Sequence, residues 1–139
     1  MEYNGDYGFD RFLEQGGASS DWEVARFGGK DLFKGLVIPG FKTGKFGCST
    51  LAARNAKGGV IYGRNFDWME CTAMVVKSKP AQGYASVSTV NLDFLDLGEE
   101  YNPDKTLSKV ISAASLYAPM DGNNEKGLCV AVLMIDDPD

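Results

Sequence analysis

The stretch that decides the fold covers residues 47–68 and reads GCSTLAARNAKGGVIYGRNFDW. Two runs of strand-forming residues, 49–54 and 60–66, flank the turn-forming segment NAKGG at 55–59. Glycine in such a turn adopts the positive φ that short hairpin loops require. The sequence therefore predicts an antiparallel hairpin that brings the end of its second strand back beside the start of its first.

Three side chains with chemical potential lie at the base of this hairpin. Cys48 opens the first strand, while Arg64 and Asp67 stand at the end of the second. We expect both charged side chains to approach the sulfur or nitrogen of Cys48 within a few ångströms. Placement of the two on opposite faces of the sheet would argue against a catalytic role. A cation favours the thiolate form of a cysteine. Taken alone, Cys48 is more readily interpreted as a small buried residue at the start of a strand, and Arg64 with Asp67 as an ordinary ion pair in a loop.

The chain contains no histidine. It therefore cannot build a Ser-His-Asp or Cys-His relay from its own residues. The α-amine of an N-terminal nucleophile is an alternative base, because its pKa of about 8 suits proton transfer at neutral pH. Cys48 would acquire such an amine only by cleavage after Gly47. A glycine at that position tolerates the backbone strain of an acyl shift onto sulfur.

Residues before the hairpin are polar, and we expect them to form a helical leader. Their apolar residues recur at helical spacing, and paired glycines end or interrupt helices. The expected elements are a helix at 9–15 ended by Gly16 and Gly17, a helix capped at 19–21 that runs to about Phe27 and is interrupted by Gly28 and Gly29, a further turn at 30–36, and a linker at 37–46.

Residues after the hairpin are expected to be mostly strands. The predicted elements are a second hairpin of 72–77 and 84–91 around the turn 80–83, an acidic loop at 96–105, a helix at 107–117, a turn at 121–127 and an apolar strand at 128–135 buried on both faces. A strand buried on both faces needs neighbours, and few residues follow it. We therefore expect the sequence to be a fragment of a longer protein.

Composition excludes several classes of function. The 139 residues are 44% hydrophobic, which suits one domain with a core. Acidic residues outnumber basic ones by 19 to 14 and no basic run occurs, so no nucleic-acid partner is expected. No apolar stretch is long enough to span a membrane. The first twenty residues lack the features of a signal peptide. The protein is expected to be cytoplasmic if Met1 is native, and secreted if a signal peptide has been removed.

The three cysteines, Cys48, Cys71 and Cys129, are too few and too widely spaced to suggest a disulfide framework or a zinc site. With no histidine to complete a ligand set, no metal is expected. The aromatic residues are interpreted as core residues, so no cofactor is expected either.

The hairpin pattern resembles the choloylglycine hydrolase family, also called linear amide C-N hydrolases. Its members include bile salt hydrolases, penicillin V acylases and amidases related to acid ceramidase. The matching residues are Cys48 and the run YGRNFDW at 62–68, in which Arg64 and Asp67 follow Cys48 by sixteen and nineteen positions. A second match is DGNNEKGL at 121–128, which is similar to the family's Asn-Glu-x-Gly-Leu turn. The resemblance covers about residues 43–135.

The resemblance implies a cysteine hydrolase of linear, non-peptide amide bonds, with a small-molecule N-acyl amide as its substrate. Cleavage between Gly47 and Cys48 would make Cys48 the nucleophile, with Arg64 against its sulfur and Asp67 holding its α-amine. The implied fold is the α+β N-terminal-nucleophile sandwich, with four αββα layers of antiparallel sheets. This chain would hold a leader at 1–47 and an incomplete catalytic domain at 48–139. The remaining C-terminal part of the protein is then a partner, and a homo-oligomer is left open.

Two further expectations accompany the resemblance. Bile salt hydrolases carry an oxyanion-binding asparagine where this chain has Met134, and methionine cannot donate a hydrogen bond. The leader resembles the prosegment of acid ceramidase-like amidases. Its apolar residues are expected to cover the acyl-binding groove until cleavage lets the leader move; these are Phe9, Phe12, Leu13 and Trp22.

Two alternatives are open at this point. One is a non-catalytic fragment or ligand-binding domain with the same fold. The other is a β-rich structural fragment whose motif is misleading. Loss of residues 1–47, seen by intact mass, would favour the hydrolase over both.

Overall fold

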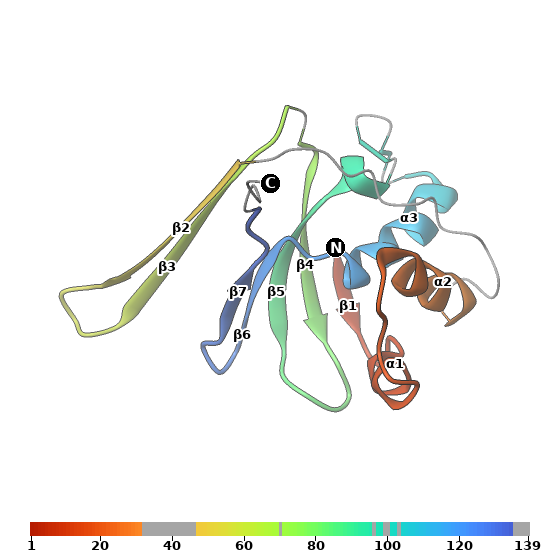
Figure 1. Cartoon of the computed structure of the whole chain (residues 1–139), viewed down its shortest axis with the longest axis horizontal. Helices are drawn as coiled ribbons and strands as arrows, with labels where there is room; N and C mark the ends of the chain where they lie inside the picture. The colour runs from red at the N-terminus through yellow and green to blue at the C-terminus, as the bar shows by residue number, and fades with distance from the viewer. Residues whose placement is uncertain (32–46, 70, 96, 99–100, 103, 135–139) are drawn as a thin grey trace, which may run out of the picture.

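The computed structural model describes residues 1–31, 47–69, 71–95, 97–98, 101–102 and 104–134. These residues form an α+β protein, as predicted, with a five-stranded sheet, a separate two-stranded hairpin and a few short helices. Figure 1 shows the hairpin β2–β3 projecting to one side of the larger sheet and the helices gathered on the other.

The five-stranded sheet has the order β1-β4-β5-β6-β7. Its strands are β1 (Glu2–Asn4), β4 (Ala73–Lys79), β5 (Ser86–Asn91), β6 (Asp121–Asn124) and β7 (Cys129–Ala131). β1 runs parallel to β4, and all the other neighbours are antiparallel. The predicted second hairpin is therefore confirmed as β4–β5.

The helical elements are α1 (Phe9–Glu14), α2 (Asp21–Asp31), the 3-10 helix η1 (Leu92–Leu95), α3 (Thr106–Ser112) and the 3-10 helix η2 (Ala113–Tyr117). The helix predicted at 9–15 is confirmed as α1, and the one at 107–117 is realised as α3 continued by η2. η1, which directly follows β5, was not predicted.

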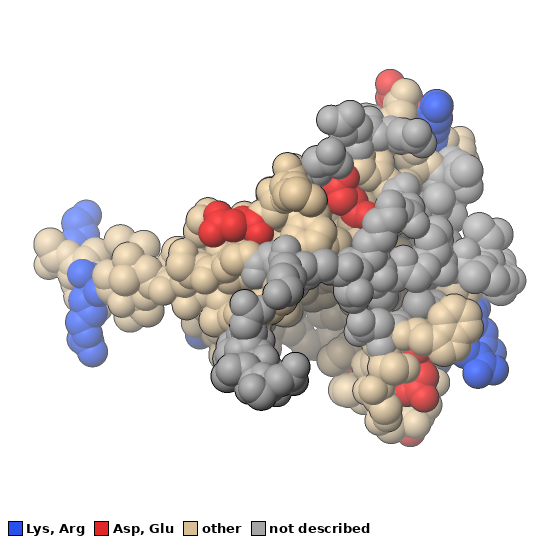
Figure 2. Space-filling view, turned by 45° about the horizontal axis from the view of Figure 1, so that its top comes forward, with Lys and Arg blue, Asp and Glu red and all other residues tan. Residues whose placement is uncertain are grey.

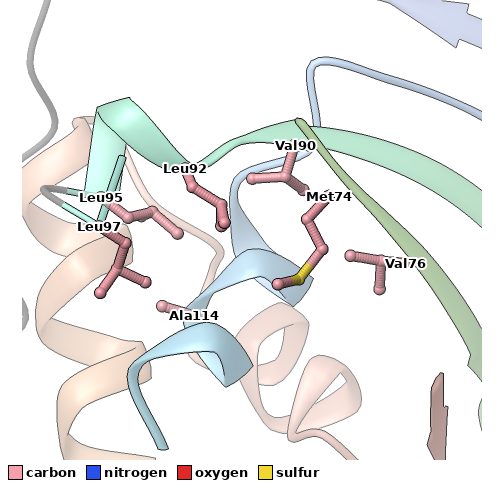
Figure 3. Packing of buried hydrophobic residues seen from close by; sticks show 7 residues of the cluster. All are labelled: Met74, Val76, Val90, Leu92, Leu95, Leu97 and Ala114. Carbon is pink, nitrogen blue, oxygen red and sulfur yellow. The ribbon is translucent and has the colours of Figure 1, made fainter. Parts of the chain in front are cut away.

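The core lies between one face of the sheet and the helical elements. Met74, Val76 and Val90 extend from that face toward η1 and η2 (Figure 3). There they meet Leu92 and Leu95, which are 1% and 0% exposed. Side chains alternate along a strand, so the next residue along β4, Val75, points to the opposite face and is 51% exposed. Among the described residues, helices therefore cover one face of the sheet and leave the other face open.

The sequence predicted a helical N-terminal segment, but the structure adds a strand there, because β1 joins the sheet. The Met1 ammonium donates to the Val75 carbonyl oxygen at 2.7 Å, and the Lys77 amide donates to the Met1 carbonyl oxygen at 2.9 Å. No local pattern marks a strand of three residues. It forms because the edge of β4 offers unpaired backbone groups.

The helix α2 contradicts the prediction that Gly28 and Gly29 interrupt it. Its start follows the predicted capping: Ser20 Oγ accepts from the Glu23 amide at 3.3 Å, and a Glu23 carboxylate oxygen accepts from the Ser19 amide at 2.6 Å. The helix then passes through both glycines, which are buried. Each glycine costs about 1 kcal/mol of helix propensity, which packing against η2 offsets.

The C-terminal strands correct two further predictions. The segment 121–127 is not simply a turn, since Asp121–Asn124 form β6 and the turn occupies only the residues that follow. The strand predicted at 128–135 is shorter, and it is not buried on both faces. Leu128 and Val130 are 63% and 59% exposed, because β7 lies at the edge of the sheet.

The first hairpin is confirmed. β2 (Gly47–Arg54) pairs antiparallel with β3 (Val60–Asp67) over eight residue pairs. Its base is anchored by aromatic rings, with Trp68 at 5.1 Å and Phe66 at 6.0 Å from Phe94 of η1. Its far end is exposed and basic, with Arg54 and Lys57 at the turn (Figure 2).

Some predictions concern residues outside the described ranges. These are the turn at 30–36 beyond Asp31, the linker at 37–46, part of the acidic loop at 96–105, and residue 135 of the last strand.

Candidate active site

Cys48 and Arg64 meet on one face of the β2–β3 hairpin. The register pairs Cys48 with Phe66 and Thr50 with Arg64, so these four side chains share that face. The Arg64 guanidinium donates from Nη2 to Cys48 Sγ at 3.3 Å. Cys48 itself is half-buried. The predicted approach of Arg64 to the cysteine sulfur is therefore present in the uncleaved chain.

Arg64 is held from several directions. Its Nη2 also donates to the Val132 carbonyl oxygen at 3.0 Å, and its Cζ lies 4.5 Å from the centre of the Phe66 ring. Its Nη1 lies 3.5 Å from Asp121 Oδ2. The Arg64 side chain is only 5% exposed, and within the described part of the chain its buried Nε has no hydrogen-bond partner. A buried guanidinium with a carboxylate beside it is a specific arrangement rather than a surface ion pair.

Asp121 is the first residue of the second family-like motif, DGNNEKGL at 121–128, but it was not predicted as a site residue. Its Oδ1 accepts a hydrogen bond from Thr89 Oγ1 at 2.7 Å, and its side chain is 18% exposed. Thr89 and Asp121 are cross-strand partners of β5 and β6, on the row that includes the exposed Val75. Arg64 therefore reaches the open face of the sheet. The position of Asp121 just before the turn was the available cue, but nothing local links it to residue 64.

The structure places Arg64 and Asp67 on opposite faces of the hairpin, so the prediction that both approach Cys48 together is wrong, and this arrangement counts against the catalytic interpretation. Asp67 pairs with Gly47, and residues three apart on a strand point to opposite faces. The Asp67 side chain is exposed, and its Oδ1 accepts from Asn65 Nδ2 at 2.7 Å. Its Oδ2 lies 3.3 Å from the point that a Cβ on Gly47 would occupy. Asp67 thus borders the residue before Cys48, on the face away from Arg64.

The other cysteines differ from Cys48. Cys71 is exposed, yet partial desolvation of its sulfur raises its pKa above the ordinary value; the Asp93 carboxylate raises it further and Arg64 opposes this. Cys129 donates weakly to the Gly127 carbonyl oxygen. No group of three or more His, Cys, Asp or Glu among the described residues could hold a metal ion. None of the helices described here is long and apolar enough to cross a membrane.

The described part of the leader, residues 1–31, borders a cavity on the helix-covered face of the sheet rather than Cys48. Its residues Tyr7, Phe9 and Phe12 border a cavity of about 420 Å³ whose floor includes Val76 and Ser88, on the helix-covered face. Asp121 also borders this cavity, but Cys48, Arg64 and Asp67 are not among the described residues that line it.

Of the four leader residues expected to cover an acyl groove, Phe9 and Phe12 border this separate cavity, and the other two lie at the surface. Leu13 and Trp22 are 56% and 60% exposed. The leader's apolar residues therefore belong to the wall of a separate cavity or to the surface, and a steric cover over Cys48 is not formed by the described residues.

The second family-like motif forms a turn that occurs twice in this chain. Asn124 Oδ1 accepts from the amides of Lys126 and Leu128, at 3.0 and 3.1 Å. Asn55 Oδ1 accepts in the same way from Lys57 and Gly59, both at 2.9 Å. The fourth residue of each turn, Gly58 or Gly127, has positive φ. This turn chemistry by itself explains the Asn and Gly of the NNEKGL run, so that motif adds little to a functional assignment.

Met134 lies three residues beyond β7 and is half-buried. Its thioether cannot replace a donating amide. Of the described side chains, Arg64 is the one recorded as a donor to the Cys48 sulfur.

Comparison of the chain with protein-family models, with curated proteins and with solved structures finds no match.

Proposed function

We propose that this chain carries the nucleophile of a cysteine amide hydrolase of the N-terminal-nucleophile type, activated by cleavage between Gly47 and Cys48. The observation that carries the proposal is the buried Arg64 guanidinium 3.3 Å from Cys48 Sγ. A cation at that distance can stabilise negative charge that develops on the sulfur as it attacks a carbonyl carbon. The proposal includes the four-layer αββα sandwich as the fold of the whole catalytic domain. A second sheet would then pack on the open face of the five-stranded sheet, on the Cys48 side.

Cleavage would begin with attack of the Cys48 sulfur on the Gly47 carbonyl carbon. The C–N bond breaks, the Cys48 nitrogen takes the thiol proton, and a thioester joins Gly47 to the sulfur. Water then hydrolyses this thioester, which leaves a carboxylate on Gly47 and a free amine and thiol on Cys48. Gly47 lacks a side chain that would block the approach of the sulfur.

Amide hydrolysis would use the new α-amine as the base. The amine takes the thiol proton, the sulfur attacks the amide carbonyl, and the departing amine receives that proton. Water hydrolyses the resulting acyl thioester to the free acid. No histidine is needed at any step, which suits a chain that has none.

The opposite placement of Arg64 and Asp67 counts against a shared role at the sulfur, so the proposal requires that they serve different atoms of Cys48. The thiol extends from one face of the hairpin, toward Arg64. The nitrogen lies in the backbone, next to Gly47, and Asp67 Oδ2 borders Gly47. Removal of the peptide bond to Gly47 would give a free amine beside this carboxylate, which would stabilise the amine once it has taken the thiol proton. The proposal thus assigns Arg64 to the sulfur and Asp67 to the amine.

The leader is expected to remain bound after cleavage rather than to leave. Its β1 is part of the sheet, and the Tyr117 hydroxyl donates to the Tyr7 carbonyl oxygen. The Phe12 ring packs 5.2 Å from Phe27 and 6.4 Å from Tyr117. The uncleaved chain would then be inactive because the Cys48 nitrogen is an amide, with no steric block required.

Self-cleavage is the first test, because it needs no substrate. The purified chain is incubated and its mass followed under denaturing conditions. We expect fragments 1–47 and 48–139, which still elute together in a native gel-filtration column. Cys48→Ala should stay intact, while Cys129→Ala, which changes a cysteine on the other hairpin, should cleave normally. Cleavage in Cys48→Ala at the normal rate, or an intact wild-type chain, would contradict the proposal.

Hydrolysis is measured next on the cleaved material, with N-acyl amides that release a fluorescent amine. Activity should appear only after cleavage. Arg64→Gln should lower the rate by about 10²-fold, the loss typical of one positioned electrostatic group. Activity that precedes cleavage would refute the role of the α-amine.

A second candidate function, ligand binding without catalysis, is favoured by one observation. The cavity of about 420 Å³ has aromatic walls from the leader and a floor that includes Ser88. Apolar cavities of this size accommodate small molecules. Binding of a fluorescent fatty acid that Ser88→Leu abolishes, in a chain that neither cleaves nor hydrolyses amides, would support this candidate over the first.

A further inference from the structure

We propose that Asp121, held by Thr89, is the positioning residue that keeps Arg64 against the Cys48 sulfur. The inference rests on the proposed role of Cys48 as a nucleophile. It concerns the folded chain before cleavage, so it can be tested without any catalytic activity.

Arg64 needs such support because of where it stands. It belongs to a hairpin that touches the rest of the molecule mainly at its base, where aromatic rings meet Phe94 (Figure 1). A free arginine side chain occupies many rotamers, and ordering it is costly. Among the described groups, the contacts that order this guanidinium are the Val132 carbonyl oxygen, the Phe66 ring and Asp121. Asp121 is the one side chain of opposite charge.

Thr89 and Arg64 contact different oxygens of the Asp121 carboxylate. Its hydroxyl donates to Oδ1 at 2.7 Å, which leaves Oδ2 facing Arg64 Nη1 at 3.5 Å. The two residues are directly opposite each other in the β5–β6 ladder, so the pair is fixed by the sheet. The sheet thereby orients a carboxylate, the carboxylate orients the guanidinium, and the guanidinium donates to Cys48 Sγ at 3.3 Å.

Asp121 affects the sulfur in two opposite ways. Its negative charge disfavours a thiolate nearby, while its hold on Arg64 favours one. Substitution of Asp121 changes both effects together. Substitution of Thr89 by valine keeps the shape and every charge, and removes only the hydroxyl that orients the carboxylate. Thr89→Val therefore isolates the positioning effect.

The experiment measures iodoacetamide labelling of Cys48 in the full chain, by peptide mass spectrometry, between pH 6 and 10. Short incubations limit the extent of cleavage, and the labelling at each time point is corrected for the fraction of chain that has been cleaved. The variants are Thr89→Val, Thr89→Ser, Asp121→Asn and Arg64→Gln. The control is Ser78→Ala, which removes a part-buried strand hydroxyl bonded to Ser86 on the helix-covered face of the same sheet.

Thr89→Val should slow Cys48 labelling at pH 7 by about fivefold, the factor that one ordinary hydrogen bond represents. Arg64→Gln should slow it further in the same direction. Thr89→Ser restores the hydroxyl and should label as the wild type does, and so should Ser78→Ala. Asp121→Asn should also slow labelling, which would mean that lost positioning outweighs the lost charge.

Two results would overturn the inference. The first is a Thr89→Val profile equal to that of the wild type in a folded protein. The second is faster labelling in Asp121→Asn, which would mean that the charge of Asp121 outweighs any positioning of Arg64. If Thr89→Val does not fold, the Asp121→Asn result decides alone. Failure of the proposed function would appear instead as an uncleaved chain, which these labelling rates do not report.

Discussion

The two hairpins β2–β3 and β6–β7 have the same turn and different surroundings. Both turns follow the pattern Asn-x-Lys-Gly, with the asparagine side chain accepting two backbone amides and the glycine at positive φ. β6–β7 extends a sheet, whereas β2–β3 stands apart as two strands. Residues such as Leu51 and Val60 on β2–β3 are 67% and 70% exposed. The same turn thus forms part of the five-stranded sheet and its helices, here called the body, in one place. In the other it forms the projecting hairpin β2–β3, here called the arm.

The residues that form the core and the candidate nucleophile therefore lie in different parts of the molecule. The core lies under the sheet that contains β6, while the candidate nucleophile Cys48 lies on the arm. A two-stranded hairpin is only marginally stable by itself. The arm is therefore expected to depend on its anchors, which are the aromatic rings at its base and the contacts of Arg64 with Asp121 and Val132.

The largest effect should come from the core of the body. Leu92→Ala removes a side chain that is 1% exposed, and it should lower the free energy of unfolding by about 2–5 kcal/mol. Leu51→Ala deletes the same atoms from the arm and should change it by less than about 0.5 kcal/mol. Urea denaturation measures both, and similar losses in the two variants would show that the arm is part of the cooperative core.

A smaller effect should come from the anchor of the arm. Phe66→Ala removes a ring that packs on Phe94 and lies under Arg64, so amides of β2 and β3 should lose about 1–3 kcal/mol of protection. Hydrogen exchange measures this loss, and amides of β4 and β5 should keep their protection. Ile61→Ala, on the opposite face of the arm and 58% exposed, is the control. Equal loss in all four strands would contradict a separately opening arm.

The matched turns provide a finer comparison. Gly58→Ala and Gly127→Ala each place a Cβ on a residue with φ of +84° or +86°, which costs about 1 kcal/mol locally. Gly127→Ala should lower the free energy of global unfolding by that amount. Gly58→Ala should lower only the opening free energy of the arm, as seen by hydrogen exchange. A global loss from both variants would mean that the two hairpins unfold together.

The smallest effect concerns the cysteine that lies between the arm and the body. Desolvation, and then the Asp93 carboxylate, raise the pKa of Cys71. A raised pKa means less thiolate at any pH below it, so Cys71 should be alkylated more slowly at pH 8 than a cysteine in the urea-unfolded chain. The rate should recover as the pH rises above 9. Asp93→Asn should speed Cys71 labelling, and no change there would contradict the role of that carboxylate.

The placement of Arg64 shows how far a local pattern can be used. The turn residues at 55–59 were sufficient to predict the pairing of β2 and β3, and the pairing brought Arg64 to Cys48. The same period of two puts residue 67 on the opposite face from residue 64, so the position of Asp67 was also available from the sequence and was misjudged. The contact of Asp121 with Arg64 could not be predicted from the sequence, because the distance between them depends on how the β2–β3 hairpin packs on the sheet.

The leader shows the opposite limit. Its helix α1 and the capping of α2 follow from residues within one or two turns. The strand β1 and the continuation of α2 through Gly28 and Gly29 depend on the edge of β4 and on packing against η2. A single sequence contains no local record of such neighbours, and they override weak propensities of about 1 kcal/mol.

The sequence by itself determined the elements that backbone hydrogen bonding within a few residues can specify. These are the two asparagine–glycine turns, the hairpins β2–β3 and β4–β5, and the helix α1. Only the tertiary structure decided which face of the sheet the helices cover, where the arm lies, and which carboxylate orients Arg64. Those features depend on contacts between residues far apart in the chain, whose free energy comes from burial and from closing long loops rather than from local pattern.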